Sequence, residues 1–104
     1  MIALIKRWLG ITPPVDFKGL IQNGAQIIDV RTKGEFMSGH IEGSVNIPLQ
    51  TLAGQLSKIK KGKPVITCCA SGMRSSSAKS MLKENGFPEV YNGGGWASLL
   101  KKIS

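Results

Sequence analysis

A chain of 104 residues has room for one small domain with a single modest core. Hydrophobic residues make up 41% of it and charged residues 19%, which is typical of a globular protein, and no apolar run approaches the roughly 20 residues that span a bilayer. The net charge of +8 indicates anionic partners. Because no arginine-rich helix, zinc finger or aromatic-and-basic strand pattern accompanies this charge, we expect no nucleic-acid binding.

The N-terminal extension, residues 1–12, is predicted to form an amphipathic helix ahead of the main domain, residues 13–104. Its segment IALIKRWL places apolar side chains on one face with Lys6 and Arg7 opposite, and Gly10 can end the helix. This helix could dock on the domain or contact a membrane surface or a partner. The basic residues follow the apolar ones, unlike the order in a secretory signal, so we expect a cytoplasmic protein.

The rest of the chain alternates predicted helices with predicted strands. Helices are predicted over residues 17–23, 50–59, 74–85 and 95–103, with a short helix or turn over 31–40. Strands are predicted over residues 26–30, 44–48, 65–68 and 89–92. This alternation indicates an α/β fold with a parallel sheet covered on both faces. Ligands of such sheets bind beyond the carboxyl ends of the strands, and residues 67–75 form a junction of that kind.

The junction has the sequence TCCASGMRS, in which two adjacent cysteines precede a glycine, an arginine and several serines. Adjacent cysteines cannot join distant segments, so we expect free thiols. Since neither a CxxC nor an HxxxH spacing is present, we expect no metal site, and the chemistry below needs no cofactor. Loop N–H groups and the helix N-terminus stabilise a thiolate at such a junction, and the thiolate is the nucleophilic form.

The residues after the cysteines suit an anion-binding loop. Ala70, Ser71 and Ser75 leave room for an anion, and Gly72 allows backbone geometry that a side chain would obstruct. The guanidinium of Arg74 could either hold an oxyanion or brace the loop.

Either cysteine could be the nucleophile by spacing alone. Counted from Cys68, the arginine completes a C-x5-R pattern, which is similar to tyrosine phosphatases and some arsenate reductases. Counted from Cys69, the pattern is CxSGxRS, which resembles the active-site loop of the rhodanese family. The resemblance extends to IIDVRTKGEFMSGHIEGSVNIPL, residues 27–49, and to GFPEVYNGGGW, residues 86–96, in the family's order.

The resemblance implies a rhodanese-like three-layer α/β/α fold with a parallel sheet of four or five strands. It implies a sulfurtransferase in which Cys69 takes a sulfane sulfur from a small anionic donor, such as thiosulfate or a persulfide, and passes it to cyanide or a thiol. We expect a monomer. A sulfur-relay protein could be a partner. The loop that would cradle the persulfide comprises Ala70, Ser71, Gly72, Met73, Arg74 and Ser75. Because thiosulfate-preferring relatives often carry a basic residue where Ala70 stands, the donor stays open.

Two alternatives belong to other functional classes. A rhodanese-fold binding module would dock a partner without turnover, although an intact loop with Cys69 counts against it. A phosphatase or arsenate reductase would use Cys68, but no general acid is assignable from the sequence. Cys68 is instead expected to be buried and inert, because it lies on the opposite side of the strand from its neighbour.

Structural roles are expected for the other conspicuous residues of these motifs. Asp29 and Arg31 would tie together the loops around the first strand, and His40 would bond to the backbone of a turn. Helix-surface or core positions are expected for Glu35, Phe36 and Trp96.

Overall fold

The computed structural model describes residues 14–104, and the helix predicted for the N-terminal extension lies outside the described residues. Within residues 14–104, four parallel strands form one sheet in the order β2-β1-β3-β4. The strands are β1 (Gln26–Asp29), β2 (Val45–Asn46), β3 (Val65–Cys69) and β4 (Val90–Gly95). The predicted α/β fold with a parallel sheet of four or five strands is confirmed, and all carboxyl ends meet at one edge.

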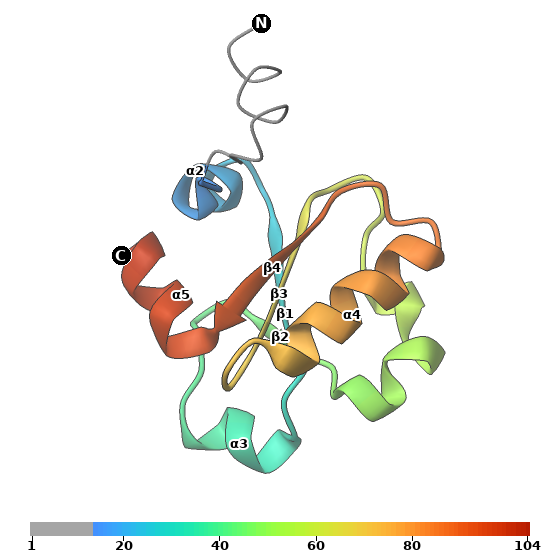
Figure 1. Ribbon diagram of the computed structural model, residues 1–104, viewed down its shortest axis with the longest axis horizontal. Coiled ribbons are helices and arrows are strands. Elements are labelled where there is room, and N and C mark those ends of the chain that lie inside the picture. Colours follow the sequence, from blue (N-terminus) through green and yellow to red (C-terminus); the bar gives the residue numbers. More distant parts are fainter. Residues whose placement is uncertain (1–13) are drawn as a thin grey trace, which may run out of the picture.

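Helices cover both faces of the sheet (Figure 1). One face packs against α2 (Phe17–Gln22) and α5 (Trp96–Ile103). The other packs against α4 (Met73–Glu84) and the two 3-10 helices η1 (Leu49–Gly54) and η2 (Leu56–Lys58). The short helix α3 (Lys33–Ser38) follows β1 at the carboxyl edge. No helix in the described part of the chain is long and apolar enough to cross a membrane.

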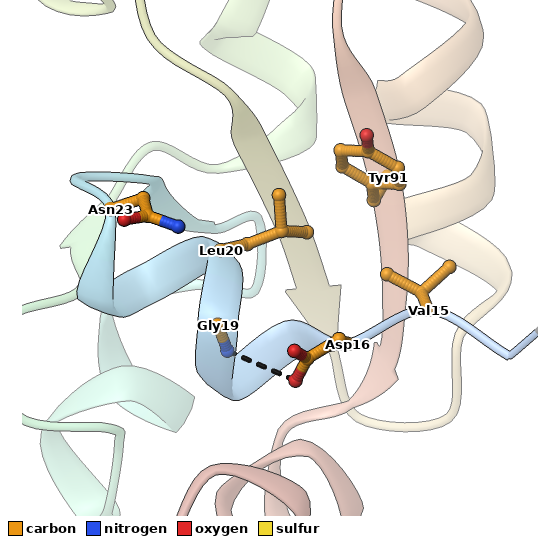
Figure 2. A pocket seen from close by; sticks show the side chains of 6 residues that line it. All are labelled: Val15, Asp16, Gly19, Leu20, Asn23 and Tyr91. Atoms are coloured by element: carbon orange, nitrogen blue, oxygen red, sulfur yellow. Dashed lines mark hydrogen bonds between the residues drawn. The ribbon is translucent and has the colours of Figure 1, made fainter.

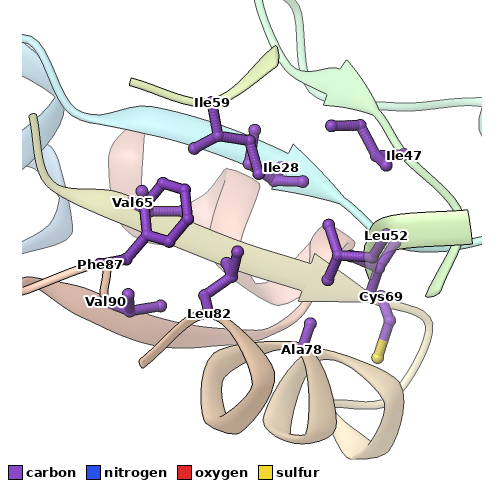
Figure 3. Close-up of a cluster of buried hydrophobic side chains, with 11 residues drawn as sticks. Ile28, Ile47, Leu52, Ile59, Val65, Cys69, Ala78, Leu82, Phe87 and Val90 are labelled. Carbon is purple, nitrogen blue, oxygen red and sulfur yellow. The ribbon is translucent and has the colours of Figure 1, made fainter. Parts of the chain in front are cut away.

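Strand residues alternate between two buried clusters, one on each face of the sheet. Ile28 and Cys69 belong to the cluster beneath α4 (Figure 3), whereas Ile27 and Cys68 belong to the cluster beneath α2 and α5. Neighbouring residues of a strand point to opposite faces, so the pleat separates the two adjacent thiols. Both cysteines are free and buried.

The single helix predicted over residues 50–59 is wrong, because this segment forms η1 and η2 instead. Its backbone bonds span three residues, from Thr51 N–H to the Pro48 carbonyl and from Gln55 N–H to the Leu52 carbonyl, both at 3.0 Å. Gly54 lies inside the segment, where a glycine costs an α-helix about 1 kcal/mol relative to alanine. Two short 3-10 turns still bury Leu52, whose exposed fraction is 0%.

Candidate active site

The loop after β3 is held tightly against β4. Cys69 pairs with Gly95 across a register shift that lies between Thr67 and Cys69. A Cβ added to Gly95 would lie 2.8 Å from the carbonyl oxygen of Ala70, so the bare backbone allows this close approach. Gly72, at the start of α4, has φ +106°, a left-handed conformation that strains other residues. These glycines let the chain curl back over Cys69.

Backbone N–H groups of the loop point at the sulfur of Cys69. The N–H of Gly72 donates to Sγ at 2.9 Å and the N–H of Ser75 donates at 3.4 Å. The N-cap residue of α4 is Gly72, which has no side chain to cap the helix. The cysteine sulfur therefore accepts the hydrogen bonds that a capping side chain would accept.

These contacts decide the ionisation of Cys69. Burial raises its pKa, since the residue is only 1% exposed. Hydrogen bonds from the Ser75 hydroxyl and from the backbone N–H groups of Ser75, Gly72 and Ser71 act in the opposite direction and outweigh burial. The pKa of Cys69 is thus lowered, which favours the nucleophilic thiolate.

The Ser75 hydroxyl is part of a small buried network. Its oxygen lies 3.4 Å from Cys69 Sγ, 3.1 Å from the Gly72 carbonyl and 2.6 Å from Asn92 Oδ1. Asn92 also accepts from the N–H of Gly94 at 2.9 Å, which links the glycine turn of β4 to the loop. The sequence analysis missed Asn92. Its position immediately before three glycines was the available signal.

Cys68 has the opposite environment. Its side chain is 0% exposed and packs in the cluster beneath α2 and α5, away from the loop. Burial raises the pKa of its thiol from 9.0 to about 12. The side chain is therefore a neutral thiol near neutral pH and lies on the wrong face to meet a ligand of the loop, as expected for a buried, inert cysteine.

Arg74 pairs with Glu35. Its guanidinium donates to the two carboxylate oxygens at 2.7 and 3.0 Å, and both side chains are about one-third exposed. Hydrogen bonding to Arg74 lowers the pKa of Glu35 to about 2. The sequence left open whether Arg74 holds an oxyanion or braces the loop, and its pairing with Glu35 indicates the bracing role. Glu35 also closes a capping box with Thr32 at the start of α3, a signal that its T-x-x-E spacing carried.

A buried ion pair supports the same edge of the sheet. Arg31 contacts Asp29 at 2.7 Å, and the side-chain exposures are 5% and 0%. The guanidinium also donates to the carbonyls of Gly39 at 2.7 Å and Glu35 at 3.2 Å, and it lies 4.8 Å from the ring centroid of Trp96. The pair thus ties the segments after β1 to α5, which is the structural role expected for it.

His40 has no contact with the loop. Its Nδ1 lies 2.7 Å from the Phe36 carbonyl, and the two rings stack with centroids 3.7 Å apart. The expected turn role therefore holds. Phe36 is half-buried rather than in the core.

A pocket lies between α2 and β4, away from the loop that follows β3 (Figure 2). It has a volume of about 320 Å³ and is lined by Val15, Asp16, Gly19, Leu20, Asn23 and Tyr91. The Asp16 carboxylate is occupied there, since it accepts the Gly19 N–H at 3.0 Å and caps α2. No group of three metal-ligating side chains occurs within residues 14–104. The loop around Cys69 is therefore the candidate active site.

Comparison with known proteins identifies the family. The sequence model of the family described as "Rhodanese-like domain" matches residues 13–102. The chain belongs to the rhodanese-like domain family. The fold agrees with this assignment, because the solved structure of a rhodanese-related protein from Thermoplasma volcanium superposes on 85% of the chain with a TM-score of 0.71.

Three relatives illustrate the similarity. YqhL of Bacillus subtilis is 46% identical over 68 residues, which cover 65% of this chain and 54% of that protein. Thiosulfate sulfurtransferase GlpE of Pseudomonas savastanoi is 35% identical over 80 residues, covering 77% and 76% respectively. The crystal structure of reduced Bacillus anthracis CoADR-RHD has a TM-score of 0.71 and 36% identity, covering 82% of this chain and 15% of that one. The chain thus spans about half of YqhL and a small part of CoADR-RHD.

Proposed function

We propose that this protein is a sulfurtransferase that carries a sulfane sulfur as a persulfide on Cys69. The observation that supports this most is the pair of N–H groups, from Gly72 at 2.9 Å and Ser75 at 3.4 Å, directed at the cysteine sulfur. The name thiosulfate sulfurtransferase borne by the GlpE relatives supports the same chemistry.

The proposed reaction has two half-reactions. The Cys69 thiolate attacks the outer sulfur of the donor, a new S–S bond forms and the donor's own bond to that sulfur breaks. The leaving group takes the electron pair and departs as sulfite from thiosulfate or as a thiolate from a persulfide. An acceptor, cyanide or a thiolate, then attacks the terminal sulfur and releases the Cys69 thiolate. One covalent intermediate shared by two half-reactions implies ping-pong kinetics.

The loop residues would act on the terminal sulfur of this intermediate. A persulfide is anionic near neutral pH and would accept hydrogen bonds from the N–H groups of the loop formed by Ala70, Ser71, Gly72, Met73, Arg74 and Ser75. The low exposure of Cys69 restricts access and suits transfer of a single sulfur atom. A cytoplasmic location, a monomeric state and a sulfur-relay protein partner belong to the same proposal.

Intact-mass measurement after incubation with thiosulfate or a persulfide donor tests the proposal. One added sulfur is expected on the natural chain and on Cys68→Ser, is expected to be absent from Cys69→Ser, and is expected to leave on addition of cyanide. A chain that acquires no sulfur from either donor would instead support the binding-module alternative. Loss of the adduct in Cys68→Ser alone would contradict the assignment to Cys69.

A further inference from the structure

The charge around the Cys69 loop indicates which sulfur donor it takes. We infer that the site loads its sulfur from a singly charged organic persulfide in preference to thiosulfate, which carries two negative charges. This inference rests on the proposed function. It follows from the placement of Arg74, whose charge is already matched by another residue.

The loop presents no unmatched positive charge to a donor. Between Cys69 and Ser75, Arg74 is the only charged residue of the sequence. Its guanidinium is held by both oxygens of Glu35 at 2.7 and 3.0 Å, so its charge is matched by a carboxylate. Met73, which precedes it, is 80% exposed and apolar. Within residues 69–75, a donor therefore meets a rim of backbone N–H groups and no unpaired charge.

This rim treats the two donors differently. In each reaction the Cys69 thiolate attacks the outer sulfur, but the groups that leave are sulfite with two negative charges or an organic thiolate with one. A cation interacts about twice as strongly with a dianion as with a monoanion at the same distance. The loop offers partial charges for the one sulfur that is transferred and lacks a full charge for the sulfonate group. Pairing of Arg74 with Glu35 therefore removes more electrostatic attraction from thiosulfate than from a persulfide.

A surface whose one arginine is paired with a carboxylate lies beside the loop and can receive the organic part of a persulfide. A small cavity of about 80 Å³ lies on the Cys69 side of the sheet, because Val30 and Leu49 in its wall pack in the same cluster as Cys69. Its lining consists of Val30, Thr32, Pro48, Leu49, Gln50 and Arg74. The only charged member is the arginine already paired with Glu35.

The rate of sulfur loading on Cys69 tests this inference without an acceptor. The second-order rate is measured by quenching and intact mass, with thiosulfate and with cysteine persulfide as donors. Met73→Lys places a free cation at the rim. Met37→Lys is the matched control, because it adds the same charge at another exposed methionine, 72% exposed on α3.

The natural chain is expected to load faster from cysteine persulfide than from thiosulfate. Met73→Lys is expected to speed loading from thiosulfate about fivefold and from cysteine persulfide about twofold, while Met37→Lys gives a smaller gain than Met73→Lys with each donor. Faster loading of the natural chain from thiosulfate, or an equal gain in both lysine variants, would overturn the inference alone. Absence of sulfur on Cys69 with both donors would overturn the proposed function as well.

Discussion

Replacing Ser75 with alanine removes the side-chain hydroxyl that hydrogen-bonds with the sulfur of Cys69. The hydroxyl oxygen lies 3.4 Å from Sγ, and its bond contributes more than any other single hydrogen bond to the lowered pKa. The backbone donors, the N–H groups of Ser71, of Gly72 and of residue 75 itself, stay in place because the substitution leaves the backbone unchanged. The variant therefore removes the bond of the hydroxyl to the sulfur together with its bonds to Asn92 and to the Gly72 carbonyl.

The expected effect is an increase of about one unit in the pKa of Cys69. A hydrogen bond to a charged group contributes about 1.5–3 kcal/mol. The lower end applies here because the distance is long and the same hydroxyl also lies 2.6 Å from Asn92 Oδ1. Since 1.36 kcal/mol corresponds to one pKa unit, the thiolate fraction below the pKa should fall about tenfold.

The pKa of the Cys69 thiol is measured from the pH dependence of thiolate ultraviolet absorbance. The Cys68 thiol does not interfere, because burial holds its pKa at about 12. Ser76→Ala serves as the control, since Ser76 is the exposed neighbour on α4 and should leave the titration unchanged. An unchanged or lowered pKa in Ser75→Ala would refute the assignment of the hydroxyl as a donor to the thiolate.

Three further predictions concern stability. The raised pKa of Cys68 contributes stability that is complete below pH 9.0 and is lost as the pH rises toward about 12. Over that range, the free energy of unfolding measured with urea should fall by up to about 4 kcal/mol more for the natural chain than for Cys68→Ala. Equal decreases in the two proteins would contradict this prediction. Arg31→Met leaves the fully buried Asp29 carboxylate without its partner and should lower the free energy of unfolding by about 3 kcal/mol or more, against less than about 1 if the pair is dispensable. Gly93→Ala places a Cβ 2.8 Å from the Thr67 carbonyl oxygen and should lower the free energy of unfolding by about 1–3 kcal/mol. Gly34→Ala is the control, because its added Cβ has no atom within 4 Å. Equal effects of the two substitutions would refute the argument that Gly93 is needed for close packing.

The sheet was predictable because its signals are local. Runs such as Ile27–Ile28 and Val65–Ile66 are apolar on both faces, as the strands of a sheet buried on both sides must be. The period of two also separates Cys68 from Cys69, so the burial of one thiol and the placement of the other follow from the pleat. The helix predicted over residues 50–59 failed because apolar spacing does not distinguish an α-helix from two 3-10 turns around a glycine.

The contacts around the loop were less predictable because they join distant parts of the chain. Glu35 and Arg74 are 39 residues apart, and the sequence alone left open whether the arginine holds an anion or braces the loop. Asn92 reaches Ser75 from β4, 17 residues away, through a register shift that no periodicity records. The identity of the loop was thus available from the sequence, whereas the direction of its charged side chain required the structure.

The central claim is that Cys69, and not Cys68, is the thiol that ionises more readily in the folded protein. Brief alkylation with iodoacetamide over a range of pH, read at each cysteine by tandem mass spectrometry of the peptide that contains both, tests it directly. The account predicts labelling at Cys69 alone, with a midpoint below the ordinary thiol pKa of 9.0. A free-thiol midpoint at Cys69, or faster labelling of Cys68 in the folded chain, would contradict it.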